Sequence, residues 1–213
     1  MLIAAIATLS YAARFATVTG PEPADLLFRP STAMGTFVLD GILLALTLLI
    51  ARGIGIRTAF ALHRPSSWPR AFRIAGLALA ATWTTSLVLE LAAGHAAREQ
   101  AVPQFWDPSR AGVFALNAIA IVVFVPIVEE SICRGIGFTL LGRWGDAAAI
   151  GGTAVAFALA HGAVLDLPWV LVTGLGLGYL RARTGSLYPC IGLHATVNGI
   201  AVLASALGGA AAG

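Results

Sequence analysis

Apolar residues fall in blocks along this chain, separated by short polar segments. Most blocks are about 16 to 22 residues long, close to the length that a helix needs to cross a hydrocarbon core of about 30 Å. They lack the alternation that the strands of a membrane β-barrel require. The pattern predicts seven transmembrane helices at approximately Leu2–Val18, Ala33–Ala51, Phe72–Ala93, Ala111–Val128, Ala147–Val164, Pro168–Leu180 and Ser186–Leu207.

The composition supports an all-α, polytopic membrane helix bundle with about seven transmembrane helices, in a range of six to eight. Of the 213 residues, 58% are hydrophobic and only 11% are charged, and the mean hydropathy is +0.87. An ordinary soluble domain carries roughly a quarter charged residues. The remaining charge is too small to cover a water-soluble globule of this size. The loops are too short for a second domain, so we expect one structural domain overall.

Arginine is the only basic residue type apart from histidine, and its distribution predicts the topology. The segment Arg52–Arg73 contains five arginines and no acid, so we place it in the cytoplasm. Alternation from there puts nine arginines inside and three outside, with the N-terminus in the cytoplasm. The first block, which holds Arg14, is expected to remain as an uncleaved helix. Charge spread over separate loops forms no nucleic-acid patch, so no nucleic-acid partner is expected.

Two adjacent acids interrupt an apolar helix at Glu129 and Glu130, and Arg134 follows one turn later. Charges at such depth are costly and mark functional sites by default. On a helix, Glu130 and Arg134 share a face and can pair, whereas Glu129 points about 100° away. The alternative is a helix end that reaches the cytosol, with two solvated acids and a snorkelling arginine.

His161 lies at the depth where it could meet Glu129. Both residues are 16 positions from Gly145, in the polar segment where an antiparallel helical hairpin would turn. At 1.5 Å per residue, each lies roughly 24 Å from that turn, so we expect them to face one another. A lone histidine in a helix is otherwise more often a satisfied core residue than a catalytic one.

His194 and Asn198 lie at i and i+4 in the last apolar block, which places an imidazole and an amide on one stripe. Hydrogen bonding between helices is an alternative role for such a pair. His194 is only about 14 Å from a turn near Gly185, so the three groups share one depth only if the Glu-bearing hairpin protrudes into the cytosol by roughly two turns.

These side chains suit hydrolysis of an unactivated carbonyl. A glutamate can take a proton from water, a histidine can share that proton or bind a metal, and a His–Asn pair can donate to an oxyanion. Glu129, His161 and His194 also have the composition of a three-ligand zinc site. The chain contains no HExxH motif, so two alternatives stay open for the cofactor: activation of water without a metal, or by a divalent metal such as zinc.

Three motifs together resemble the CPBP family of intramembrane proteases, which includes the type II CAAX prenyl endopeptidases and the bacterial Abi proteins. Residues 129–134 (EESICR) fit EExxxR, 157–161 (FALAH) fit FxxxH, and 194–198 (HATVN) fit HxxxN. The resemblance covers about residues 111–205. It implies a helical bundle around a cavity that is open to the cytosolic side, in a bacterial or archaeal cytoplasmic membrane.

The resemblance also implies roles for individual residues. Glu129 would activate water, and His161 would be its partner or a metal ligand. His194 and Asn198 would stabilise the oxyanion or, for His194, complete the metal site. Glu130 and Arg134 would orient these groups.

The expected activity is hydrolysis of a peptide bond in a membrane-anchored, prenylated or C-terminal peptide, so the expected partners are a peptide or membrane-protein substrate and the lipid bilayer. The expected parts are N-terminal helices of unassigned role (1–110), a catalytic core (111–205) and a flexible tail (206–213). A non-catalytic scaffold that binds a peptide or protein partner is an alternative function. A proton- or metal-coupled transporter is disfavoured because the chain shows no internal symmetry. The substrate and the oligomeric state are not indicated by the sequence.

Other polar or special residues have weaker meaning. Pro126 either kinks the helix that carries the glutamates or is tolerated by neighbouring helices. Three glycines in one apolar block favour close helix packing over nucleotide binding. Asp40 is expected to pair with Arg14, and Glu90 to lie near the outer interface. The two cysteines, Cys133 and Cys190, are expected to be buried thiols. The three glycines are Gly174, Gly176 and Gly178.

Overall fold

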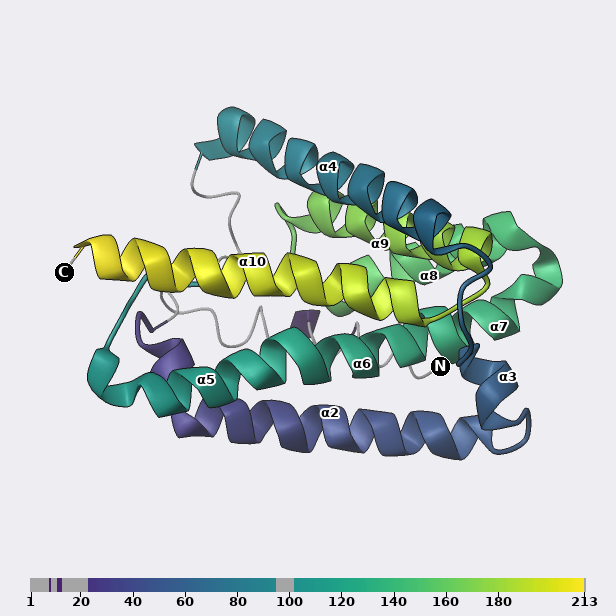
Figure 1. The fold of residues 1–213 in the computed structure, drawn as a ribbon, viewed down its shortest axis with the longest axis horizontal. Helices are drawn as coiled ribbons and strands as arrows, with labels where there is room; N and C mark the ends of the chain where they lie inside the picture. The colour runs from purple at the N-terminus through teal and green to yellow at the C-terminus, as the bar shows by residue number, and fades with distance from the viewer. Residues whose placement is uncertain (1–7, 9–10, 13–22, 95–101, 213) are drawn as a thin grey trace.

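The computed structural model describes residues 8, 11–12, 23–94 and 102–212 (Figure 1). Within these residues every regular element is helical and none is a strand. The predicted all-α membrane bundle is therefore confirmed. The predicted first helix falls mostly outside the described residues, and so does Arg14, the expected partner of Asp40.

Four of the described helices are long and apolar enough to cross a membrane. They are α2 (Pro30–Ala51), α4 (Trp68–Ala93), a continuous helix over Pro108–Trp144, and α10 (Tyr188–Ala212). Large apolar side chains on α2 and α4 point away from the protein; Leu77 and Leu91, for example, are 73% and 78% exposed. Such surfaces fit a lipid environment, and the chain is an integral membrane protein.

Prolines and glycines set the ends of several helices. α2, α4 and α9 (Leu167–Thr184) each carry proline in the first turn, where its missing N–H costs no helical hydrogen bond. α9 stops at Gly185, which has the left-handed conformation with φ 71°. α8 (Asp146–Ala160) starts after Gly145, at φ 95°, which makes the hairpin turn expected at this residue.

The long helix over Pro108–Trp144 is not a uniform α-helix. Two π-helical segments, η4 (Ala120–Phe124) and η5 (Ser131–Gly137), lie on either side of α6 (Val125–Glu130), which carries both glutamates. Pro126 stands just after the first π segment, so the backbone accommodates its missing N–H by local rewinding. The remaining parts are η3 (Pro108–Arg110), α5 (Ala111–Ile119), α7 (Phe138–Leu141) and η6 (Gly142–Trp144).

α9 packs tightly between α8 and α4 because glycines remove side chains from its surface. A Cβ added at Gly174 or Gly178 would lie 3.1–3.2 Å from backbone atoms of α8. A Cβ at Gly176 would lie 2.7 Å from the Cβ of Ala78 on α4. Close helix packing, which the sequence favoured for these glycines, is confirmed.

Two connections fix the ends of the bundle. At one end, the loop after α3 (Ile56–Phe60) is tied to the α9–α10 turn, because Ala61 O accepts from Leu187 N and Thr184 O accepts from Ser66 N. At the other end, η1 (Leu26–Phe28) inserts Phe28 among the rings of Phe105, Trp106 and Phe114.

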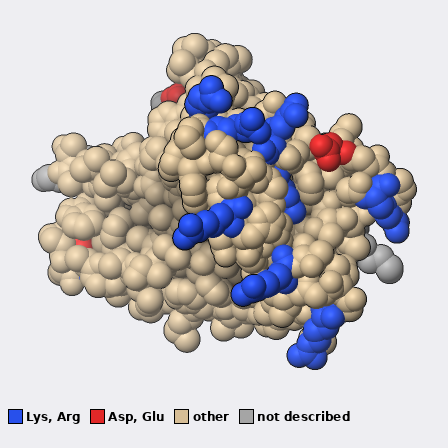
Figure 2. Space-filling view, turned by 45° about the vertical axis from the view of Figure 1, so that its right-hand side comes forward, with Lys and Arg blue, Asp and Glu red and all other residues tan. Residues whose placement is uncertain are grey.

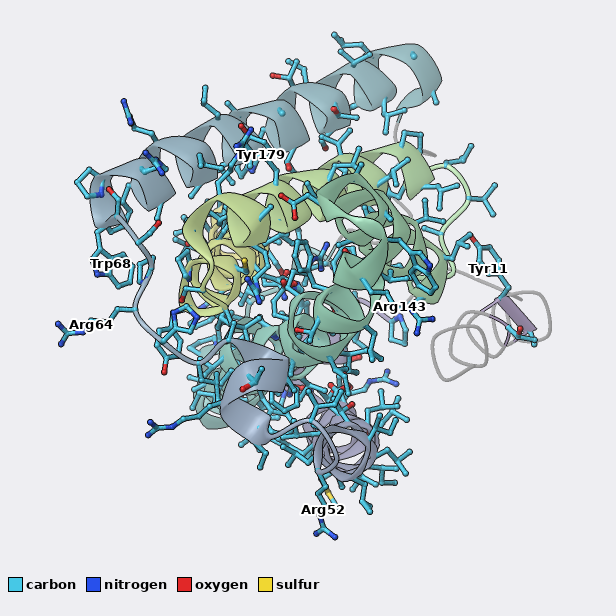
Figure 3. The ribbon with its side chains drawn as sticks, turned by 90° about the vertical axis from the view of Figure 1, so that its right-hand side faces the viewer. Tyr11, Arg52, Arg64, Trp68, Arg143 and Tyr179 are labelled. Atoms are coloured by element: carbon cyan, nitrogen blue, oxygen red, sulfur yellow. The ribbon has the colours of Figure 1, made fainter. Side chains whose placement is uncertain are left out.

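Arginine side chains gather at the end of the bundle formed by α3, α7 and the α9–α10 turn (Figures 2 and 3). Figure 3 labels Arg52, Arg64 and Arg143 at this end. At the opposite end Arg29 and Arg110 are paired with Asp25 and Asp107. We refer to the first of these ends as the arginine-rich end; its exposed arginines are Arg52, Arg57, Arg64, Arg70, Arg73, Arg143 and Arg183.

Candidate active site

Glu130 and Arg134 form a fully buried ion pair. Both side chains have 0% exposure, and Arg134 Nη1 donates to Glu130 Oε1 at 3.0 Å. The pairing predicted from their i, i+4 spacing is confirmed. Arg134 also donates from Nη2 to the carbonyl oxygen of Gly174 on α9, at 2.8 Å. The alternative, in which this stretch is a solvated helix end, does not fit either burial value.

His194 on α10 binds the same glutamate. Its Nδ1 lies 2.9 Å from Glu130 Oε1. Glu130 is paired with a guanidinium and therefore accepts as a carboxylate, so the imidazole N–H stands on Nδ1. This bond turns His194 Nε2 toward Glu129, whose Oε2 is 3.9 Å away.

His161 faces Glu129 from the end of α8. Its Nδ1 donates to the carbonyl oxygen of Phe157 at 2.8 Å, and its Nε2 lies 4.0 Å from Glu129 Oε2. Gly162, at φ 64°, ends the helix directly after it. The equal distance from Gly145 thus predicted the approach of His161 and Glu129 correctly.

The distance of each residue from its helical turn explains how His194 reaches the same point as Glu129 and His161. Glu129 and His161 are 16 residues from their turn at Gly145, whereas His194 is nine residues from the turn at Gly185. The α7–α8 hairpin therefore extends beyond the α9–α10 turn by about 10 Å. Figure 1 shows the α7–α8 hairpin reaching beyond the α9–α10 turn, as the sequence argument required; the cytosolic side of this end stays a prediction.

Three atoms that accept hydrogen bonds converge at Glu129. They are Oε2 of Glu129 and the Nε2 atoms of His161 and His194. Glu129 Oε2 is shielded from solvent and has no hydrogen-bond partner among the described residues, although the side chain as a whole is 31% exposed. Distances near 4 Å are too long for direct hydrogen bonds. The three acceptors are therefore suited to bind a water molecule or a cation.

The residue types at this point suit zinc, but the distances between them are long for zinc ligands. Each imidazole is oriented through Nδ1 by an oxygen, as in many zinc sites. However, ligands about 2.0–2.1 Å from one tetrahedral zinc ion lie only about 3.3 Å apart. Among the described residues no group of three His, Cys, Asp or Glu side chains is arranged to hold a metal. Ligation by Glu129, His161 and His194 therefore stays a prediction.

Asn198 lies one turn beyond His194 and contacts the long helix rather than the two glutamates. Its Nδ2 donates to the carbonyl oxygen of Ile121 at 2.9 Å. The expected stripe of imidazole and amide on one face is present, but this contact gives Asn198 the interhelical hydrogen bond that the sequence left as an alternative.

Phe157 has a larger part in the site than the sequence indicated. Its ring centroid is 4.5 Å from that of His161 and 5.6 Å from that of His194, and the guanidinium carbon of Arg134 lies 4.5 Å from it. The ring therefore contacts the buried arginine and both imidazoles. Its position one turn before His161 was the available signal.

None of the six predicted site residues lines either of two cavities on the described surface. One of about 440 Å³ lies at the arginine-rich end, with Arg57, His63 and Arg181 in its wall. The other, of about 320 Å³, is an apolar groove between α4 and α9, with Leu77 and Leu175 in its wall.

Comparison with known proteins identifies the part of the chain that holds the site. Residues 111–200 match the family model described as Rce1-like, type II CAAX prenyl endopeptidase Rce1-like. Searches of curated proteins and of solved structures gave no match. The matched segment contains all six predicted site residues and agrees with the 111–205 covered by the motif resemblance. Residues 111–200 of this chain are therefore similar to the Rce1-like type II CAAX prenyl endopeptidases, which supports the family that the three motifs indicated.

Proposed function

We propose that this protein is an intramembrane endopeptidase in which Glu129 activates water for attack on a peptide bond. The observation that carries the proposal is the convergence of Glu129 Oε2 with the Nε2 atoms of His161 and His194 within 4.0 Å. These groups come from three separate helices of a membrane bundle. A carboxylate that faces two imidazoles across the width of one water molecule is well placed to act as a general base.

The proposed reaction uses one water molecule held among these acceptors. Glu129 Oε2 takes one proton as the water oxygen attacks the carbonyl carbon, and an imidazole Nε2 accepts a hydrogen bond from the second O–H of the water. The proton on Glu129 then passes to the leaving nitrogen as the C–N bond breaks, which restores the Glu129 carboxylate. The second water proton stays on the new carboxylic acid until it passes to the new amine, so the products are a peptide carboxylate and a peptide ammonium.

Glu130, Arg134 and Phe157 act as positioning residues in this proposal. Glu130 fixes the tautomer of His194 through Nδ1, and Arg134 holds Glu130. The Phe157 carbonyl fixes His161 in the same way. Because the two imidazoles are oriented before substrate arrives, little of the binding free energy is needed to align them.

If a divalent metal binds here, Glu129, His161 and His194 would hold it, and it would supply Lewis acid polarisation of water or carbonyl. Metal analysis of purified protein, followed by chelation and readdition of zinc, tests this point separately from proteolysis. Activity that survives complete chelation would leave the residues above as the whole catalytic apparatus.

We further propose that the substrate is a membrane-anchored, prenylated or C-terminal peptide that is cleaved on the cytosolic side. The excess of exposed arginine at the end of α3, α7 and the α9–α10 turn supports that side, because arginine accumulates in cytoplasmic loops. A lipid-anchored substrate fits a site that is carried on membrane-spanning helices.

The decisive experiment is cleavage of prenylated, acylated and transmembrane peptides by protein in detergent or nanodiscs. Glu129→Gln and His161→Gln should each reduce turnover by at least about 100-fold. Glu90→Gln, which removes a carboxylate from α4, is the matched control and should retain turnover. Equal turnover in all four proteins, or cleavage by none while peptide binding persists, would contradict an enzyme and favour the scaffold function.

A further inference from the structure

The carbonyl oxygen of Ile121 has no backbone donor in its own helix. In an α-helix it would accept from Val125 N, but that N–H donates to Ala120 O in the π-helical segment. The next donor in the π pattern would be residue 126, which is proline and has no N–H. The π segment and the proline together therefore leave this oxygen to a partner from outside the helix.

Asn198 supplies that partner. Its Nδ2 donates to Ile121 O at 2.9 Å across the contact between α10 and η4. The two helices are close here: a Cβ added at the neighbouring Gly199 would lie 3.5 Å from Val122 Cγ1. An unsatisfied carbonyl inside a membrane protein costs several kcal/mol, so this amide stabilises the π-helical form of the segment.

The π-helical form matters because it sets the direction of Glu129. A π-bulge is equivalent to one extra residue in an α-helix, and one residue corresponds to a rotation of about 100°. If residues 120–124 rewound as an α-helix, the helix beyond them would turn by about that angle relative to α5. Glu129 and Glu130 also differ by about 100°, so the rotation is large enough to bring the wrong glutamate toward the histidines.

We propose that Asn198 is a positioning residue for Glu129: its amide replaces the N–H missing at Pro126 and thereby keeps residues 120–124 in the π-helical form that aims Glu129 at His161 and His194. The proposal rests on the proposed function for its catalytic consequence. Its structural part, the hydrogen bond to Ile121, can be tested without any activity.

The direct test is the carbonyl ¹³C resonance of Ile121. The chain contains only two Ile–Val steps, 121–122 and 127–128, so labelling with [1-¹³C]isoleucine and [¹⁵N]valine isolates two signals. Asn198→Ala should move the Ile121 signal upfield, as expected for a lost hydrogen bond. The Ile127 carbonyl, which accepts from Ser131 Oγ, is the internal control and should not move. An unchanged Ile121 signal would overturn the proposal.

A double-mutant cycle tests whether Asn198 acts through this carbonyl. In the native background, Asn198→Ala should lower the unfolding midpoint and reduce turnover by roughly 100-fold, the cost of a misplacement of about 1 Å. In the Pro126→Ala background a backbone N–H is available again, so adding Asn198→Ala should change the unfolding midpoint little. If Pro126→Ala alone is active, adding Asn198→Ala should reduce its turnover by less than about tenfold. Equal losses in both backgrounds would instead assign Asn198 to the reacting atoms. Lack of turnover in the wild type would refute the proposed function. The unfolding midpoint and the Ile121 carbonyl signal would then still decide whether Asn198 holds the π-helical segment.

Discussion

Glu129 and Glu130 are neighbours in the sequence but have opposite environments. Glu130 is fully buried, with Arg134 and His194 both on its Oε1, whereas Glu129 is partly exposed and turned toward two imidazole nitrogens. The 100° between consecutive helical residues is enough to produce this difference. One carboxylate therefore belongs to the packed interior, and the other faces the two histidines at the candidate site.

Removal of the arginine from the buried pair should destabilise the protein strongly. Arg134→Met leaves Glu130 without its cation and also removes the donor to Gly174 O, so we expect a loss of about 3–5 kcal/mol in the free energy of unfolding. Reversible unfolding in mixed micelles measures it. Arg143→Met, at an exposed arginine over Trp144, is the matched control and should change stability by less than about 0.5 kcal/mol. Equal effects would show that the ion pair contributes nothing.

The sequence was informative about residues whose position follows from helical counting. The i, i+4 pairing of Glu130 with Arg134 and the equal spacing of Glu129 and His161 from Gly145 both follow from 1.5 Å and 100° per residue. The contact of Asn198 with Ile121 could not be counted in this way. It depends on which carbonyl the π segment leaves without a donor, and the run of residues 120–124 is apolar like its surroundings.

At the scale of elements, the long helix shows where the sequence pattern was insufficient. The apolar block ends at Val128, and the helix continues to Trp144, as the turn expected at Gly145 requires; Glu130 and Arg134 stay inside the bundle because they pair with each other. The two π-helical segments within this helix were not predicted. Burial of six consecutive residues, 131–136, is possible because Gly135 leaves room for the ring of Phe60. The sequence predicts the helix, whereas its winding depends on these tertiary contacts.

The packing of α9 on α8 should be sensitive to a single methyl group. Gly174→Ala would place a Cβ 3.1–3.2 Å from Ala154, including its Cα and carbonyl oxygen, and α8 would have to move. We expect a loss of about 1–3 kcal/mol in the free energy of unfolding and a parallel fall in turnover, because α8 carries His161. Gly151→Ala, on α8 with open space around it, should be neutral or add up to about 1 kcal/mol. An unchanged free energy of unfolding in Gly174→Ala would contradict the prediction, because it would mean that α8 and α9 can move apart at no cost.

The charged connection at the other end should depend on pH. Hydrogen bonds from Ser109 and Arg110 hold the pKa of Asp107 below its ordinary value of 3.8. A lowered carboxyl pKa contributes stability that is present above about 3.8 and is lost as the pH falls through the lower folded-state value. The difference in unfolding midpoint between wild type and Asp107→Asn should therefore be constant near neutrality and shrink below pH 3.8. Asp146→Asn, at the arginine-rich end, is the control. A difference in unfolding midpoint between wild type and Asp107→Asn that persists to pH 2 would contradict the prediction.

For the whole molecule, the distribution of charge predicts the orientation in the membrane. Seven exposed arginines lie at one end of the bundle, while the described arginines of the opposite end are paired with Asp25 and Asp107. Both native cysteines are buried, so we expect little labelling of the unmodified chain by a thiol reagent. The orientation can therefore be measured with single engineered cysteines.

Trp144→Cys marks the arginine-rich end and Ser109→Cys marks the other. In intact bacterial cells, a membrane-impermeant maleimide should label Ser109→Cys but not Trp144→Cys, because arginine-rich loops stay in the cytoplasm. Inverted membrane vesicles should give the reverse, and the unmodified chain should remain unlabelled in both. Labelling of Trp144→Cys in intact cells would reverse the topology and place the α7–α8 hairpin outside.

The length of the Pro108–Trp144 helix has a consequence for the lipid environment of catalysis. Eighteen residues separate Ala111 from Glu129, or about 27 Å along the axis, against a hydrocarbon thickness of about 30 Å. With Ala111 at one edge of the hydrocarbon, the proposed base lies near the opposite headgroup boundary, where water is abundant, and the 15 residues from Glu130 to Trp144 extend past it. Thickening the bilayer with longer acyl chains would then place the carboxylate in hydrocarbon, so we expect the proposed hydrolysis to slow as the surrounding lipid becomes longer.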